Sequence, residues 1–412
     1  MSERFAAGPR LAEFEAAREV VARVADVTPL ETARFLSDIL GSPVLLKCEN
    51  LQRTGSYKIR GAYNRLSRLT DEEKARGVVA ASAGNHAQGV AFAARELGIA
   101  ATIFMPVGVP LPKLQATRGY GAEVVLRGHT VEEPLRAAAE FAETTGAVFI
   151  HPFDHNDVVV GQGTVALEIL DQVDDFDTII VPIGGGGLIS GISSVLKQRE
   201  AAGGRRVRVI GVQAANAAPY PPSIINGYPT EIRTQPTIAD GINVAKPGAL
   251  NFEIIKDAVD DIITVDDDLI ARALLLLLER GKLVVEPAGA AGVAAILSGQ
   301  ILDAGKTVVV LSGGNIDPLM MERVISHGLA ASERYLKLRI PLPDRPGQLA
   351  RTAALVAEAN ANVVEVLHTR HGSGMQFSQV VLELHIETRG PTHADQVLEV
   401  LREAGYDPRI AF

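Results

Sequence analysis

The most constraining feature of this sequence is a regular alternation of short apolar runs with Ala-rich amphipathic runs. The apolar runs cover residues 43–48, 77–81, 101–105, 123–126, 148–150, 178–183, 207–213, 261–265 and 307–311. Helical patterns separate them, as at residues 267–280. Such alternation predicts doubly wound parallel sheets of the α/β class. Because a chain of 412 residues is too long to fold around a single hydrophobic core, we expect two such parallel-sheet domains.

The alternation stops after Ser312. A polar stretch at 326–334 precedes a strand-like run at 335–342, and the order beyond it is helix, strand, turn, strand and helix. The helices are expected at 348–359 and 394–404, the strands at 363–368 and 379–386, and the turn at Gly372 and Gly374. This order, closed by a short last strand, predicts a ferredoxin-like α+β domain. We therefore divide the chain into residues 1–330, with a smaller α/β subdomain at about 49–150, and residues 331–412.

Composition excludes several classes of function. The net charge of -9 opposes nucleic-acid binding, which needs a basic face. The single cysteine, Cys48, rules out an intrachain disulfide and a cysteine-based zinc site, and it fits a cytoplasmic location. No apolar run is long enough to span a membrane, so no membrane partner is expected.

Four glycines, Gly184, Gly185, Gly186 and Gly187, follow the apolar run 178–183 and precede a helical pattern near Leu188. Glycines let backbone N–H groups approach an anion, and a helix N-terminus adds partial positive charge. The alternative interpretation is a tight turn. A dinucleotide site is not indicated, because no G-x-G-x-x-G pattern occurs and the next strand lacks a terminal acidic residue. No lysine follows the glycines, so a P-loop is excluded too. The remaining ligand for this loop is a single phosphate ester on an organic cofactor.

Lys58 lies between a polar loop and an Ala/Leu-patterned helix, in the segment Ser-Tyr-Lys-Ile-Arg-Gly-Ala. Most lysines near a helix start are solvated surface residues. Partial removal from water would favour the neutral amine and hence formation of a Schiff base. Phe153, within a polar His/Asp-rich segment at 151–157, is a candidate for a pocket wall. In that segment turn formation is favoured over metal binding. We expect no required divalent metal, whereas a requirement for a monovalent ion is left open.

Four motifs together resemble those of the threonine dehydratases: residues 49–62, residues 82–89, the four glycines and residues 312–315. The resemblance covers residues 28–317 and implies a pyridoxal 5'-phosphate enzyme with the tryptophan-synthase-β-like fold, fold type II. It implies that Lys58 forms the Schiff base with the cofactor. Its other implied cofactor-binding residues are Asn85, Gly184, Gly185, Gly186, Gly187, Leu188, Glu286 and Ser312. The substrate would contact Ser82, Ala83, Gly84, Asn85 and His86.

The resemblance also implies an activity, the conversion of L-threonine to 2-oxobutanoate and ammonia, and of L-serine to pyruvate and ammonia. Two alternatives stay open: a serine racemase or serine dehydratase, and a non-catalytic amino-acid-binding regulator. Racemases of this kind carry a second serine where this chain has Ala83, which disfavours racemisation. Whether such an enzyme serves isoleucine synthesis or threonine breakdown is left open.

The segment Asp344, Arg345, Pro346 and Gly347 opens the first helix of the C-terminal domain. That domain resembles an ACT domain, which implies an effector site for an amino acid or a nucleotide and assembly as a homodimer or homotetramer. The free N–H groups of the helix start suit a carboxylate. A plain dimerisation module is the alternative.

Overall fold

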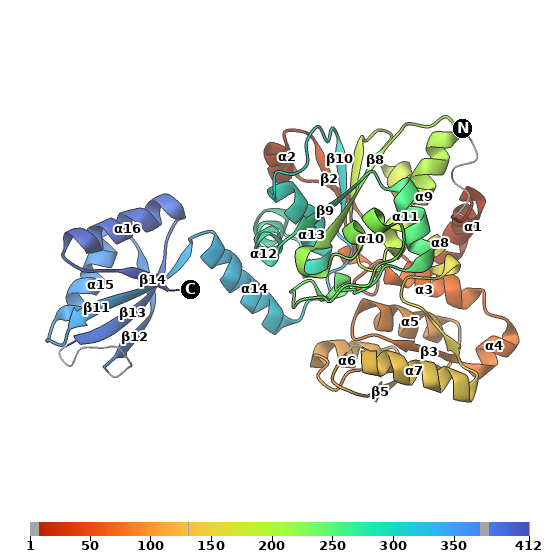
Figure 1. Cartoon of the computed structure of the whole chain (residues 1–412), viewed down its shortest axis with the longest axis horizontal. Coiled ribbons are helices and arrows are strands. Elements are labelled where there is room, and N and C mark those ends of the chain that lie inside the picture. Colours follow the sequence, from red (N-terminus) through yellow and green to blue (C-terminus); the bar gives the residue numbers. More distant parts are fainter. Residues whose placement is uncertain (1–7, 131, 371–378, 412) are drawn as a thin grey trace. The chain divides into compact units, whose positions relative to one another are not determined.

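The computed structural model describes residues 8–130, 132–370 and 379–411. The chain divides into two compact units, Met1–Met320 and Met321–Phe412. The first is a layered α/β body and the second a small sheet with two helices packed on it (Figure 1). The predicted turn at Gly372 and Gly374 lies outside the described residues.

A six-stranded sheet organises the first unit in the order β1-β2-β10-β7-β8-β9. Its strands are β1 (Leu30–Thr32), β2 (Val44–Lys47), β7 (Thr178–Pro182), β8 (Arg208–Ala214), β9 (Asp261–Val265) and β10 (Thr307–Val310). β1 runs antiparallel to β2, and every other neighbouring pair is parallel. The residues that follow β7 and β10 therefore meet at one edge of the sheet, where ligands of open α/β sheets bind.

Helices cover both faces of this sheet. Ile179 and Val181 pack against one helical layer, and Ile180 faces the opposite layer at Gly292, because successive strand side chains alternate between faces. The first layer holds α1 (Leu11–Val21), α8 (Asn156–Gln172), α9 (Gly187–Ala201) and α11 (Ala249–Ala258). The second holds α2 (Arg34–Leu40), α12 (Asp267–Leu276), the π-turn η4 (Leu277–Gly281) and α13 (Pro287–Leu297) (Figure 1).

A second, four-stranded parallel sheet has the order β5-β4-β3-β6. Its strands are β3 (Val78–Ala81), β4 (Ala101–Met105), β5 (Glu123–Leu126) and β6 (Val148–Phe149). Val78 and Ile103 pack with α3 and α5, whereas Val79 and Phe104 pack with α7 on the other face. The surrounding helices are α3 (Lys58–Ser67), α4 (Asp71–Arg76), α5 (Asn85–Glu96), α6 (Leu111–Gly119) and α7 (Glu132–Thr145). The two parallel sheets confirm the predicted doubly wound architecture.

Short helical segments complete the first unit. They are η1 (Glu49–Leu51), η2 (Ala215–Ala217), α10 (Tyr220–Asn226) and η3 (Asp240–Ile242). The helix α14 (Pro318–Ala331) begins at the end of the first unit and continues into the second, which starts at Met321. Among the described residues, no helix combines the length and the apolar character needed to cross a membrane.

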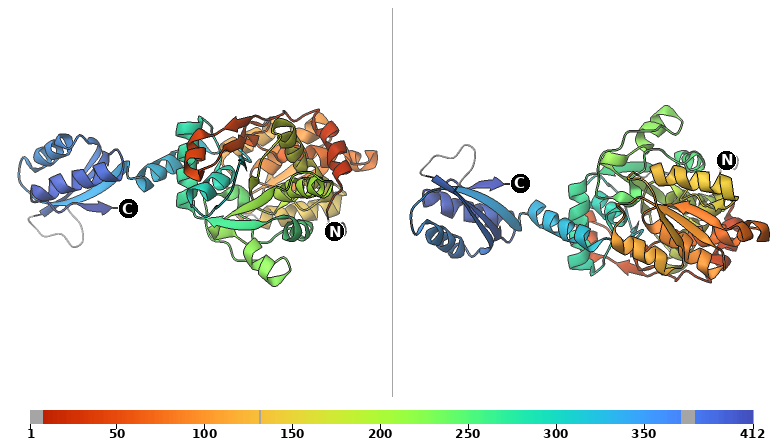
Figure 2. Two further views of the ribbon diagram at one scale, coloured as in Figure 1. Left: turned by 90° about the horizontal axis from the view of Figure 1, so that it is seen from above. Right: turned by 90° about the horizontal axis from the view of Figure 1, so that it is seen from below.

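The second unit has the element order strand, helix, strand, strand, helix, strand. These elements are β11 (Tyr335–Pro343), α15 (Gln348–Glu358), β12 (Asn362–Thr369), β13 (Gln379–Glu387), α16 (Pro391–Glu403) and β14 (Arg409–Ala411). The strands form an antiparallel sheet in the order β12-β13-β11-β14. Side chains of β11 are alternately buried and exposed, and α15 and α16 pack side by side over the buried face (Figure 2). This arrangement is ferredoxin-like, as predicted.

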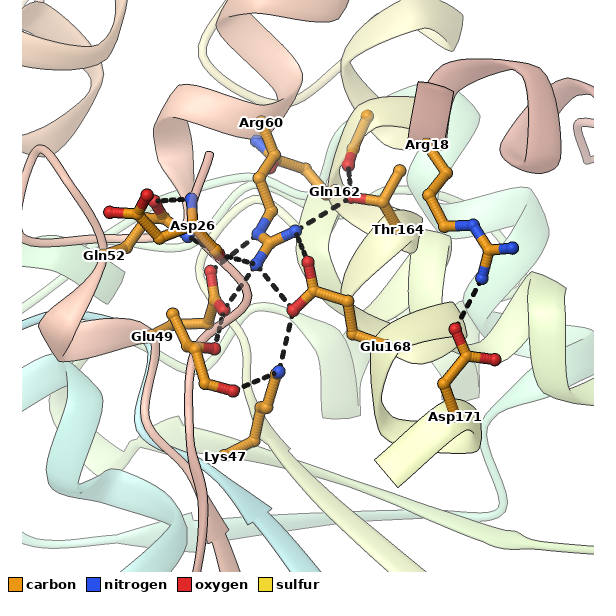
Figure 3. Close-up of polar contacts among 12 residues, drawn as sticks. Arg18, Asp26, Lys47, Glu49, Gln52, Arg60, Gln162, Thr164, Glu168 and Asp171 are labelled. Atoms are coloured by element: carbon orange, nitrogen blue, oxygen red, sulfur yellow. Dashed lines mark hydrogen bonds and ion pairs between the residues drawn. The ribbon is translucent and has the colours of Figure 1, made fainter. Parts of the chain in front are cut away.

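A buried ion cluster of Arg60, Lys47, Glu49 and Glu168 fixes the start of α3 (Figure 3). The Arg60 guanidinium donates to both Glu49 oxygens at 2.8 Å and to the two Glu168 oxygens at 2.6 and 2.9 Å. Lys47 Nζ donates to Glu168 at 2.8 Å. Burial alone would raise the pKa of Glu49, but the neighbouring Arg60 lowers it on balance. The two positive charges of Arg60 and Lys47 therefore balance the two negative charges of Glu49 and Glu168 inside the protein.

Candidate active site

A cavity of about 330 Å³ opens at the carboxyl ends of β3, β7 and β10. It brings together segments that are far apart in the sequence. Its lining includes every catalytic, cofactor-binding and substrate-binding residue predicted above: Lys58, Ser82, Ala83, Gly84, Asn85, His86, Phe153, Gly184, Gly185, Gly186, Gly187, Leu188, Glu286 and Ser312. The structure thus shows that these residues share one cavity, while their individual roles stay predictions.

Lys58 begins α3 and reaches into the cavity. Its Nζ donates a hydrogen bond of 2.8 Å to the backbone carbonyl of Pro152. Burial lowers the pKa of Lys58 to about 8, and the nearby Glu286 carboxyl partly opposes that shift. A lysine with this pKa carries a useful fraction of neutral amine near neutral pH, which both nucleophilic attack and proton abstraction require.

The four glycines form a loop between β7 and α9 whose backbone is open to the cavity. Gly186 has a φ of +100°, in the region that favours glycine, and a Cβ there would overlap the Tyr220 hydroxyl. A Cβ at Gly185 would overlap the Phe153 ring. Because α9 begins at Gly187, its first N–H groups have no helical carbonyl to pair with. The loop therefore has the shape and the electrostatics of an anion cradle.

Two residues that sequence reasoning missed hold this loop in place. The Tyr220 hydroxyl and Asn251 Nδ2 both donate to the Gly185 carbonyl, at 3.1 and 3.0 Å. Asn251 Nδ2 also donates to the Phe153 carbonyl at 3.1 Å, so the cavity wall and the glycine loop are joined. Neither residue belongs to a recognisable motif, and only the fold brings them to the glycines.

The loop after β3 leads into the N-terminus of α5, which begins at Asn85. Ser82 Oγ accepts a hydrogen bond from the Gly84 N–H at 3.2 Å. The His86 ring is buried and its Nε2 lies 2.9 Å from the Ile150 carbonyl. Burial and then the nearby Lys58 charge lower the pKa of His86 to about 3, so the ring is neutral and donates to that carbonyl. An anion at this loop would consequently meet backbone N–H groups rather than a charged histidine.

Glu286 lies at the start of α13 and is buried in the cavity wall. Burial raises its pKa to about 7, and the Asp240 charge adds to the rise, while Lys113 and Asn85 oppose it. Lys113 and Asp240 form an ion pair of 2.7 Å and also line the cavity. Sequence reasoning missed this pair, because nothing in either local segment signals the contact.

Ser312 follows β10, is buried and lies in the cavity lining. Its carbonyl accepts a hydrogen bond from the Tyr57 N–H at 3.2 Å. The neighbouring residues Ser56 and Gly313 form an isolated antiparallel β-bridge. These contacts join the end of β10 to the start of α3. The side chain that Ser312 presents is a hydroxyl, which imposes no fixed charge on a bound ring.

The histidines of the 151–157 segment make turn contacts. His151 Nδ1 accepts from the N–H groups of Phe153 and Asp154, and His155 Nδ1 accepts from the Asp157 N–H. Over residues 8–130, 132–370 and 379–411, no group of three or more His, Cys, Asp or Glu side chains is placed to hold a metal ion.

In the second unit, Asp344, Arg345, Pro346 and Gly347 line a separate cavity of about 400 Å³ with His368 and Arg370. Arg370 pairs with Asp344 at 3.4 Å. Gly347 caps α15 with a φ of +87°. The predicted effector residues thus surround one hollow beside a helix N-terminus.

Comparison with known proteins identifies the family. Residues 21–313 match the model of the pyridoxal-phosphate dependent enzymes. The chain is 45% identical over 400 residues to an L-threonine ammonia-lyase of Thermotoga maritima, covering 97% of this chain and 99% of the relative. It is 47% identical over 380 residues to an L-threonine ammonia-lyase of Geobacter sulfurreducens, covering 92% and 94%.

Solved structures agree with this assignment. Threonine deaminase isoform 2 of Solanum lycopersicum has a TM-score of 0.72 at 36% identity, covering 78% of this chain and 95% of that chain. Maize serine racemase has a TM-score of 0.71 at 35% identity, covering 79% and 98%. These likenesses confirm the predicted fold class. The chain belongs to the pyridoxal-phosphate dependent enzymes and, within them, to the family of the L-threonine ammonia-lyases.

Proposed function

We propose that this protein is an L-threonine ammonia-lyase that converts L-threonine to 2-oxobutanoate and ammonia, and L-serine to pyruvate and ammonia. The observation that carries the proposal is the placement of Lys58 and the glycine loop in one cavity, with the N-terminus of α5 beside them. The L-threonine ammonia-lyases that align over nearly the whole chain support the choice of substrate.

The cavity fits pyridoxal phosphate. The glycine loop has no Cβ atoms, so Phe153 and Tyr220 pack directly against its backbone, and the start of α9 supplies donors for a phosphate ester. Lys58 would hold the aldehyde carbon, and Asn85, Glu286 and Ser312 would surround the ring. When bound, the cofactor supplies an electron sink for charge that develops at the α-carbon of an amino acid. The neutral hydroxyl of Ser312 at the ring would favour elimination over transamination.

The chain's own residues would carry out the binding and the proton transfer. The amino-acid carboxylate would bind the backbone N–H groups at the start of α5, beside Ser82 and Ala83. The Lys58 amine would remove the α-proton, because its lowered pKa lets it act as a base near neutral pH. Phe153 would close the wall and exclude water.

The lowered pKa of Lys58 predicts how cofactor uptake depends on pH. Only the neutral amine attacks an aldehyde, so the uptake rate of the apoprotein should rise about tenfold per pH unit below pH 8 and level off above it. Stopped-flow absorbance after mixing apoprotein with pyridoxal phosphate measures this rate. A rate that keeps rising to pH 10, as for an ordinary lysine, would contradict the role of burial.

Gly186→Ala should weaken cofactor binding by about tenfold or more, because an Ala at a φ of +100° is strained and its Cβ would displace Tyr220. Equilibrium titration of the apoprotein with pyridoxal phosphate measures the affinity. Gly203→Ala is the matched control, since Gly203 has a φ of +93° and no atom lies within 4 Å of its added Cβ. Equal affinities for the two variants would argue against the glycine cradle.

Serine racemase is the second candidate, favoured by the likeness to the maize enzyme. Ala83 argues against it, because no hydroxyl at that position can return a proton to the other face of the substrate. We expect ammonia release from L-threonine and L-serine to exceed D-serine formation. Ala83→Ser should raise the ratio of D-serine to ammonia by about tenfold. D-serine formation that outpaces ammonia release in the unaltered enzyme would favour the racemase.

For the second unit we propose an ACT-like regulatory role, with an amino acid such as isoleucine or valine, or a nucleotide, bound beside Asp344–Gly347. The ferredoxin-like strand order and the hollow at the start of α15 support this proposal. We further propose a cytoplasmic homodimer or homotetramer. Initial rates measured against titrated amino acids and AMP test the effector, and a rate insensitive to all of them would favour a plain dimerisation module.

A further inference from the structure

Asn315 closes the Ser-Gly-Gly-Asn segment after β10 but does not line the cavity. Its Nδ2 donates to the Thr54 backbone carbonyl and to Asn85 Oδ1, each at 2.8 Å. Asn85 Nδ2 in turn donates to Glu286 Oε1 at 2.6 Å. Three side chains from three distant segments thus form one directed chain of hydrogen bonds, which begins at a backbone carbonyl and ends at the cavity wall.

The direction of this hydrogen-bond relay, from Thr54 through Asn315 and Asn85 to Glu286, is determined at the Thr54 carbonyl where it begins. A backbone carbonyl can only accept, so the atom of Asn315 that faces Thr54 must be the amide nitrogen. That nitrogen also faces Asn85, and the Asn85 atom opposite it must therefore be the carbonyl oxygen. The Asn85 amide nitrogen is then turned toward Glu286. Each orientation follows from the one before it.

We infer that Asn315 is a positioning residue, which fixes the side-chain amide of Asn85 so that it offers an N–H rather than a carbonyl to the ring of the bound cofactor. This inference rests on the proposed function. An amide nitrogen carries two hydrogens, and Glu286 accepts only one of them from Asn85. The second is left for a molecule in the cavity that Asn85 lines. A donor there favours an ionised hydroxyl on the cofactor ring.

Gly55 supports the same assignment. It has a φ of +73°, and a Cβ at this position would overlap the amide of Asn315. The Gly55 carbonyl also accepts a hydrogen bond of 2.8 Å from the Gly314 N–H. The loop before Lys58 is therefore shaped to admit the Asn315 side chain and to hold the backbone beside it.

Asn315→Asp tests the relay, because it keeps the shape of the side chain but removes the donor that faces Thr54 and Asn85. Asn315→Ala removes the donor without adding charge. If the Asp variant does not fold, the Ala variant tests whether Asn315 orients the Asn85 amide. Asn50→Asp is the matched control: Asn50 is also buried beside Gly314, and its Nδ2 donates to the Val284 carbonyl at 3.0 Å. It therefore adds the same charge and loses a similar hydrogen bond outside the relay.

The readout is the visible absorbance of the bound cofactor without substrate at a fixed pH, which reports the ratio of ionised to neutral ring hydroxyl. We expect both Asn315 variants to lower this ratio about tenfold, the worth of one charge-assisted hydrogen bond, and Asn50→Asp to leave it unchanged. The relay is wrong if the unaltered protein binds cofactor and the Asn315 variants keep its ratio of ionised to neutral ring hydroxyl. It is also wrong if Asn50→Asp lowers that ratio as much as the Asn315 variants do. If the unaltered protein takes up no cofactor, the proposed function itself fails.

Discussion

Lys58→Ala is expected to lower the rate of ammonia release from L-threonine by about a thousandfold or more, because it removes both the attachment point of the cofactor and the base for the α-proton. The same variant should abolish exchange of the substrate α-proton with deuterium from the solvent, as measured by NMR. The fold should persist, since the Lys58 side chain makes one hydrogen bond, to the Pro152 carbonyl, and belongs to no ion pair of the buried ion cluster.

Lys113→Ala is the matched control for this result. Lys113 lines the same cavity, but its amine is paired with Asp240 at 2.7 Å. Its removal should change the rate far less than removal of Lys58. Retained α-proton exchange in Lys58→Ala, or an equal loss in Lys113→Ala, would take the base assignment away from Lys58.

Arg60→Ala is expected to lower the free energy of unfolding by about 3–5 kcal/mol, because it leaves Glu49 and Glu168 buried with Lys47 as the one remaining cation of the cluster (Figure 3). Chemical denaturation of the apoprotein measures this change. The variant should also bind cofactor more weakly, since Arg60 and Lys58 lie two positions apart on α3 and the cluster holds the start of that helix.

Two further variants separate the possible causes. Arg18→Ala breaks the exposed ion pair with Asp171 and should cost at most about 1 kcal/mol. Arg60→Lys keeps the charge but loses the paired hydrogen bonds to Glu49, so it should fall between the two. A cost for Arg60→Ala no larger than that for Arg18→Ala would show that the buried ion cluster does not stabilise the fold.

Much of the fold could be predicted because apolar periodicity reports on it directly. The expected strands at 123–126 and 261–265 coincide with β5 and β9. The stretch at 326–334 is polar in the sequence, and α14 nevertheless continues to Ala331, because a helix tolerates polar residues on its exposed side. The helix expected at 394–404 begins earlier, at Pro391, since proline is tolerated in the first helical turn.

Some residues of the candidate site could be predicted from local sequence, and others could not. Lys58 and the four glycines carry local signals, namely an unusual lysine context and a strand-glycine-helix pattern. Tyr220 and Asn251 carry none, because their roles come from hydrogen bonds to segments distant in the sequence. Asn315 lies in the motif at 312–315, but its contact with Asn85 is seen only in the structure. Local pattern therefore predicts the groups that would touch a cofactor, and only the three-dimensional structure shows the groups that hold them in place.

In the proposed mechanism, Lys58 carries the cofactor while the glycine loop holds its phosphate. Reduction of the cofactor-loaded protein with borohydride, followed by proteolysis and mass spectrometry, tests it most directly, because reduction makes the lysine attachment permanent. We predict that the pyridoxyl phosphate mass is found on the peptide that contains Lys58, and that Gly186→Ala lowers its yield at limiting cofactor. Attachment to another lysine, or to none, would contradict the proposed role of Lys58.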